Sequence, residues 1–194
     1  NSGTSASSST FWRGDASWAE AGGGAFTKLL TANASTTDYL DFDDTVITST
    51  YRTYLFLIHK FRPVDDNIEI EVKHSVDNGT SFVSGTTDYI QQFQYNGQGS
   101  SEYLHLSGSA QSSAWLTNGN VGSGFYESLD GVLWLNGGTA YTNATYSLVS
   151  VNSNNCQYWD GAYSVFSGGV DFVRFQASGG AITSGSISLY GVEF

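Results

Sequence analysis

Short apolar stretches separated by turn-forming residues recur along the whole sequence of 194 residues. About eleven such stretches can be counted, at intervals of roughly ten residues. No stretch shows the apolar repeat of 3.6 residues that marks an amphipathic helix. The sequence contains 23 glycines and only one proline, so glycine, asparagine and aspartate supply most of its turn signals. This pattern predicts an all-β fold, either an antiparallel sandwich or a barrel.

The most apolar part of the sequence begins at Tyr51 and ends at Phe61. In a strand, successive side chains point to opposite faces. Tyr54, Phe56 and Ile58 would therefore lie on one face, with Leu55 and Leu57 on the other. Because both faces are apolar, we expect a central strand that is covered on both sides.

The last 25 residues, 170–194, predict two strands joined by a turn. The turn is Ala177-Ser178-Gly179-Gly180, where glycine can supply the positive φ of a tight turn. Period-two alternation resumes through Ile187 and Leu189 and shifts at Gly191, which predicts a bulge. We expect this segment to form a hairpin that closes the β-fold. Asp77-Asn78-Gly79 predicts another tight turn.

Charge and composition exclude several classes of protein. The formal net charge is −11, with only 7 lysines and arginines and no basic run, so we expect no nucleic-acid binding. No apolar run approaches the roughly 18 residues of a membrane span, so we expect no membrane insertion. Cys156 is the only cysteine. It cannot form an intramolecular disulfide, and we expect a buried or half-buried side chain.

Catalytic and metal-binding patterns are missing from the sequence. His59, His74 and His105 lie far apart on predicted strands, without the spacing of metal ligands. The acidic cluster around Asp41 lacks the glycine and the spacing of an EF-hand loop, and a solvated edge explains it better than calcium. The 18 acidic residues allow many carboxylate pairs, but nothing singles out one pair. We therefore expect no enzyme, no cofactor and no metal.

Aromatic residues supply the better functional signal. Trp115, Tyr141, Tyr158 and Trp159 lie in stretches predicted as loops, and Asp160 follows directly. Flat aromatic rings beside hydrogen-bonding groups suit sugar rings, which have apolar faces and polar edges. These five residues are the candidate ligand-binding site, and the run 158–160 is expected to be exposed. Most aromatic residues of a sandwich, however, fill its core.

The first ten residues, NSGTSASSST, have the composition of a flexible arm or linker. We expect residues 11–194 to form a single domain.

Three blocks together resemble a loosely related group of tailed-bacteriophage virion proteins, described as tail fibre or minor structural proteins. The first runs from Tyr51 to Gly85, with its strand, proline turn, alternating strand and D-x-G-T-x-F hairpin. The second is ESLDGVLW, Glu127 to Trp134. The third and most specific is GVDFVRFQASGGAITSGSISLYGVEF, Gly169 to Phe194.

The resemblance implies a jelly-roll-like antiparallel β-sandwich on the virion surface, often in homotrimers, and it implies no catalytic residues. The shared positions are turn glycines and core apolar residues. We expect a virion structural protein, a tail appendage that contacts the host surface, with copies of itself, other virion proteins and a host surface glycan as candidate partners. Two alternatives remain: a capsid decoration protein and a secreted carbohydrate-binding module.

Overall fold

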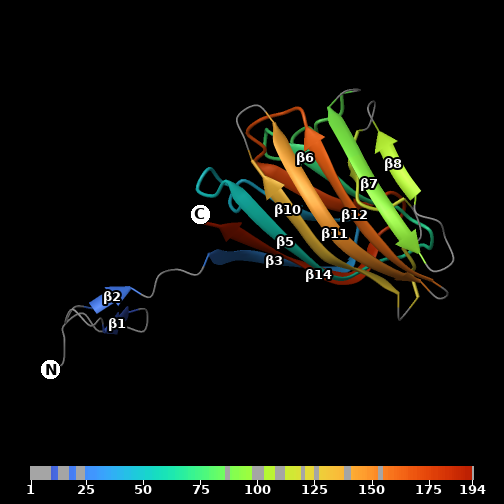
Figure 1. Cartoon of the computed structure of the whole chain (residues 1–194), viewed down its shortest axis with the longest axis horizontal. Helices are drawn as coiled ribbons and strands as arrows, with labels where there is room; N and C mark the ends of the chain where they lie inside the picture. Colours follow the sequence, from blue (N-terminus) through green and yellow to red (C-terminus); the bar gives the residue numbers. More distant parts are fainter. Residues whose placement is uncertain are drawn as a thin grey trace.

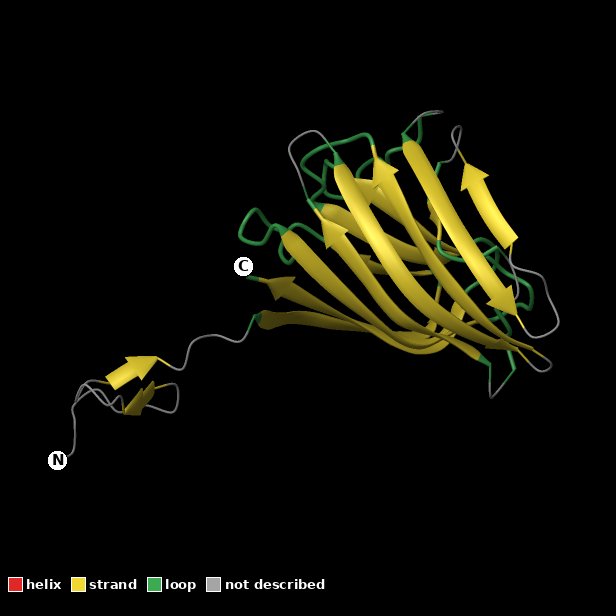
Figure 2. Cartoon of the chain, viewed as in Figure 1, coloured by secondary structure: helices red, strands yellow, loops and turns green. Residues whose placement is uncertain are grey.

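The computed structural model has an all-β fold, and the residues that it describes contain no helix, hence none that could cross a membrane. Two antiparallel sheets pack face to face as a β-sandwich (Figure 2), as the sequence predicts. The jelly-roll connectivity stays a prediction. The described residues are 10–12, 18–20, 25–85, 88–97, 103–107, 112–118, 121–124, 127–137, 141–152 and 155–193.

The two sheets differ in size. The large sheet has eight strands, in the order β3 (Phe26–Thr37), β14 (Ile182–Val192), β5 (Thr53–Pro63), β10 (Ser128–Asn136), β11 (Thr142–Asn152), β12 (Asn155–Val165), β7 (Tyr89–Gly97) and β8 (Tyr103–Ser107). The small sheet has four, in the order β4 (Tyr39–Phe42), β13 (Phe172–Ala177), β6 (Ile70–Ser75) and β9 (Ala114–Trp115). Figure 1 shows the strands of the large sheet side by side.

Two further strands precede the sandwich in the chain. β1 (Thr10–Trp12) and β2 (Trp18–Glu20) pair with each other in a two-stranded sheet of their own. The expected flexible arm, residues 1–10, lies outside the described residues except for Thr10.

The predicted central strand is β5, which lies between β14 and β10 in the large sheet. Tyr54, Phe56 and Ile58 are buried on its inner face. On its outer face Leu55 is 8% exposed and Leu57 is 36% exposed. The prediction of a central strand is confirmed, although only Leu55 is covered on the outer side.

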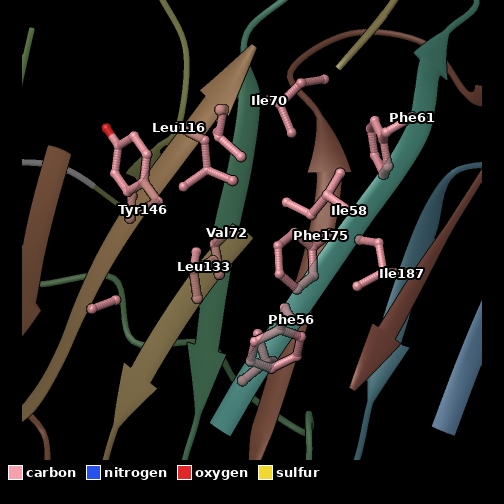
Figure 3. Close-up of a cluster of buried hydrophobic side chains, with 14 of the residues drawn as sticks. Phe56, Ile58, Phe61, Ile70, Val72, Leu116, Leu133, Tyr146, Phe175 and Ile187 are labelled. Atoms are coloured by element: carbon pink, nitrogen blue, oxygen red, sulfur yellow. The ribbon is translucent and has the colours of Figure 1, made fainter. Parts of the chain in front are cut away.

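The core lies between the facing sides of the two sheets (Figure 3). Phe56 of the large sheet meets Phe175 and Phe42 of the small sheet, with each pair of ring centroids 5.2 Å apart. Edge-to-face and tilted ring contacts of this kind add specific attraction to the burial of apolar area. The rings therefore fix how the two sheets are placed against each other.

The expected C-terminal hairpin is wrong. β13 pairs with β4 and β6 in the small sheet, whereas β14 pairs with β3 and β5 in the large sheet. The turn does form, with φ at Gly180 of 70°. It crosses from one sheet to the other, because the apolar sides of the two strands face each other across the core instead of sharing one side of a hairpin.

A bulge interrupts β5 where it passes β14. Lys60 takes a φ of 48°, and the pairing of β5 shifts here against both of its neighbours. Gly185 of β14 passes this point with a φ of 124°, and a Cβ on it would lie 2.6 Å from the Lys60 carbonyl oxygen. Glycine is required because neither that φ nor that approach suits a side chain. The shift predicted at Gly191 occurs next to it, between Leu189 and Tyr190 in the pairing with β3.

Candidate binding site on the outer face of the large sheet

An open hollow of about 530 Å³ lies on the outer face of the large sheet, over β10, β11, β12 and β7. These four strands are neighbours in the sheet (Figure 1). Each contributes two outward side chains in two rows across the strands. One row is Trp134, Thr145, Ala162 and Gln92, and the other is Val132, Ser147, Asp160 and Gln94. The hollow therefore depends on the register of four strands and not on a loop.

Trp134 forms the apolar end of the hollow. Its ring centroid lies 6.0 Å from that of Phe26 on β3, three strands away. Strands three places apart in a flat sheet would be separated by roughly 14 Å. The two side chains therefore lean toward each other over the strands between them. This convergence explains why Leu55 and Val192, on the outer face, are only 8% and 4% exposed.

Polar groups on β11, β12 and β7 also line the hollow. Asp160 is half-buried, and within the described part of the chain its carboxylate makes no hydrogen bond or ion pair. The exposed amides of Gln92 and Gln94 likewise have no hydrogen-bond partner among the described side chains and backbone. Ser147 shares a hydrogen bond of 2.7 Å with the hydroxyl of Tyr158. The hollow therefore presents hydrogen-bond acceptors and donors on β12 and β7 and an indole ring on β10.

Tyr146 supports the hollow from beneath. Its ring lies against Gly161, where a Cβ would come within 2.6 Å of the Tyr146 hydroxyl oxygen. The hydroxyl donates a hydrogen bond of 3.1 Å to the Trp115 carbonyl oxygen. Burial, with a smaller contribution from the charge of Asp160, raises the pKa of Tyr146 far above its ordinary value. Tyr146 is therefore a neutral structural residue.

Of the candidates from sequence, the structure places Asp160 in the hollow and Tyr158 beside it on the same face, 45% exposed. The expectation for Trp159 is wrong, because its side chain is 0% exposed. Its indole N–H donates a hydrogen bond of 2.8 Å to Ser150 Oγ in the core. The physical reason is strand alternation: the run is not a loop but part of β12, which turns 158 and 160 outward and 159 inward.

The same alternation corrects the expectation for Cys156, which is exposed on the outward side of β12. Trp115 is not in a loop either. It lies in β9 of the small sheet and packs half-buried against the core. Tyr141 precedes β11 and is 53% exposed, with its ring 5.3 Å from that of Phe166. Neither Trp115 nor Tyr141 lines the hollow.

Sequence reasoning missed Trp134, Gln92 and Gln94 as site residues. The signal for Trp134 was present, because Val132 and Trp134 alternate with Leu133 and Leu135 and so place apolar residues on both faces of one strand. An outward tryptophan on such a strand is a candidate for binding. Nothing in the local sequence indicates that β7 lies two strands away from β11.

The acidic cluster and the histidines singled out from the sequence are not among the described residues that line the hollow. Asp41 holds Arg174 in a two-pronged ion pair, with both N–O distances 2.7 Å. His59, His74 and His105 lie in β5, β6 and β8, as predicted. Within the described ranges, no group of three or more His, Cys, Asp or Glu side chains could hold a metal ion.

No protein-family model matches the sequence, and neither a curated protein nor a solved structure matches the chain.

Proposed function

We propose that this chain is a structural protein of a bacteriophage virion, a tail appendage that contacts the host surface by binding carbohydrate in the hollow over β10, β11, β12 and β7. The observation that carries the proposal is that one hollow is lined both by Trp134 and by Asp160, Gln92 and Gln94, whose polar groups have no partner among the described residues. An indole face packs on the apolar face of a sugar ring, while carboxylate and amide groups bond its hydroxyls. The role is recognition without catalysis.

The sequence blocks that resemble phage virion proteins support the virion location. A chain of net charge −11 with few lysines also stays soluble when many copies are crowded together.

We further propose that eight of the strands form a jelly roll. Four of these strands are neighbours in the large sheet, in the order β3-β14-β5-β10. The other four form the small sheet, in the order β4-β13-β6-β9. The chain changes sheet at each step from β3 to β6, and again between β9 and β10 and between β13 and β14. This alternation supports two nested Greek keys. The added strands β11, β12 and β7 then extend the large sheet beyond β10 and supply most of the hollow.

Glycan binding is tested on the purified chain with an array of bacterial and plant oligosaccharides, followed by titration of the best ligand. Trp134→Ala should weaken binding by roughly tenfold or more, because a central aromatic contact is lost. Tyr141→Ala removes an exposed aromatic outside the hollow and should change nothing. If the wild-type chain binds no glycan, or if the two variants behave alike, the glycan part of the proposal is wrong.

A secreted carbohydrate-binding module is the second candidate, because the hollow itself would serve that role equally well. The location of the chain, on phage particles or free, distinguishes the virion protein from the secreted module. Antibodies against the chain should label purified phage particles if the virion proposal is right, and absence of the chain from particles would favour the secreted module.

A further inference from the structure

We propose that the hollow selects uncharged glycans of at least two sugar units and rejects anionic ones, with Asp160 as the residue that sets this selectivity. The inference rests on the proposed function, since it takes the hollow as a carbohydrate site. Beyond that function, it specifies which class of carbohydrate the hollow binds.

The charge in the lining of the hollow is negative. Among the described residues that line it, Asp160 is the only charged one, and none is a lysine, an arginine or a histidine. Lys28 is exposed on β3, three strands from β10, and is not among the residues that line the hollow. An anionic sugar in the hollow would therefore meet a carboxylate without a compensating cation.

Asp160 is suited to accept hydrogen bonds from the hydroxyl groups of a sugar. Its carboxylate is half-buried, so part of its hydration is already lost, and no partner in the described chain occupies its oxygens. Hydrogen bonds to an ionised acceptor are roughly twice as strong as neutral ones. Two neighbouring hydroxyls of a neutral sugar satisfy the carboxylate, whereas a uronate, sialate or sulfate group near it adds repulsion. The acidic chain as a whole strengthens that repulsion.

The spacing of the two anchors sets the minimum length of the ligand. Trp134 is on β10 and Asp160 is on β12, two strands away, roughly 10 Å across the sheet. The Trp134 ring leans toward Phe26, on the side of β10 away from β12, so the two anchors are at least that far apart. A single pyranose ring stacked on the indole does not extend to the carboxylate. We therefore infer that one sugar unit packs on Trp134 while the next lies over Asp160, with Gln92 and Gln94 beyond it on β7.

The test uses a glycan array that pairs neutral oligosaccharides with counterparts bearing uronate, sialate or sulfate groups. The wild-type chain should bind neutral members of two or more units, and binding of the anionic counterparts should be at least roughly tenfold weaker. The Asp160→Asn variant should lose affinity for the neutral ligands and lower the ratio of neutral to anionic binding by roughly tenfold or more.

Asp44→Asn is the matched control. It makes the same change in net charge at an exposed position in the turn after β4, outside the hollow, and should leave the ratio unchanged. Thermal unfolding of both variants confirms that each is folded, and Asp160→Ala provides a second substitution. If glycans bind but anionic and neutral members bind alike, or if Asp160→Asn leaves the ratio unchanged, the selectivity inference fails while the proposed function stands. A ligand set restricted to amino sugars would also overturn it. If no glycan binds at all, the proposed function itself fails.

Discussion

His74 is a buried histidine in the core of the sandwich, held between two tyrosines. Its side chain is 0% exposed, Nε2 lies 2.9 Å from the Tyr163 hydroxyl, and the ring stacks on Tyr89 with centroids 6.1 Å apart. Nδ1 has no hydrogen-bond partner among the residues that the structure describes. Burial lowers the pKa of His74 to about 3, and burial raises the pKa values of both tyrosines. All three groups are therefore neutral at neutral pH.

This arrangement predicts a loss of stability on mild acidification. Below pH about 6.5 the unfolded chain takes up a proton on His74, and the folded chain does not until the pH approaches 3. The contribution of His74 to the free energy of unfolding is therefore fully present above pH 6.5. Below that pH it falls by about 1.4 kcal/mol per pH unit, which is about 2 kcal/mol between pH 6.5 and pH 5. Urea unfolding at pH 7 and pH 5 measures this directly.

The control for that prediction is His74→Gln, which cannot titrate and should remove most of the difference between the two pH values. The carboxyl group of Asp77, whose pKa is lowered to about 2 by hydrogen bonds from Ser75 and Ser81, loses its contribution only at lower pH. An unchanged pH dependence in the His74 variant would assign the effect to other groups.

For individual residues, the sequence indicates which side chains could bind a sugar. It does not indicate whether each side chain faces the core or the solvent. Tyr158 and Trp159 are adjacent aromatics, and a period of two leaves either one free to face the core. Trp159 faces inward because the core has room for its ring against Tyr95, with centroids 4.8 Å apart. Packing between strands decides which of the two side chains faces the core, and the local sequence does not indicate it.

Among the elements, β14 is constrained most tightly where it passes the bulge of β5. Lys60 donates its backbone N–H to Asp130 Oδ1 over 2.8 Å, which satisfies the backbone group displaced by the bulge. Gly185 lies against Lys60 and Phe61 from the other side, and a Cβ on it would lie 2.7 Å from the Phe61 Cα. Backbone atoms surround the position, so a new side chain could not be accommodated by a rotamer change.

We predict that Gly185→Ala lowers the free energy of unfolding by roughly 1–3 kcal/mol, since it combines an unfavourable positive φ with a backbone clash. Gly137→Ala is the matched control, because the nearest atom to its added Cβ is 3.9 Å away. Denaturant titration of the two variants gives the comparison. Equal stabilities would mean that β14 can shift away from the bulge.

Turn chemistry is the part of the elements that the sequence predicts well. Asn78 and Gly79 take φ values of 54° and 76° at the predicted tight turn, and Gly180 turns the chain after β13. The partners of the strands are harder to predict. The turn at Gly180 joins two different sheets, because a glycine turn permits a hairpin or a crossing and only the packing of the apolar faces decides between them.

On the scale of the whole molecule, the sandwich is unequal, with eight strands against four. The all-β class follows from the period and spacing of the sequence. The unequal sheets do not, because they depend on long-range pairings such as that of β12 with β7. The candidate hollow lies where these pairings occur, so its aromatic and its polar halves come together only in the folded chain.

The proposed role also makes a prediction for assembly. The hollow is open and crosses only four strands, so a single copy should hold a glycan weakly. Several copies on one particle raise the overall avidity by a factor of about 10² to 10⁴ without any new contact. The resemblance to phage virion proteins implies homotrimers, so we expect a native mass near three times the 20.8 kDa of the chain in light scattering at both dilute and concentrated protein. A monomer at both concentrations would contradict the self-assembled trimer, and binding to a densely coated glycan surface should then be no tighter than binding to a sparse one.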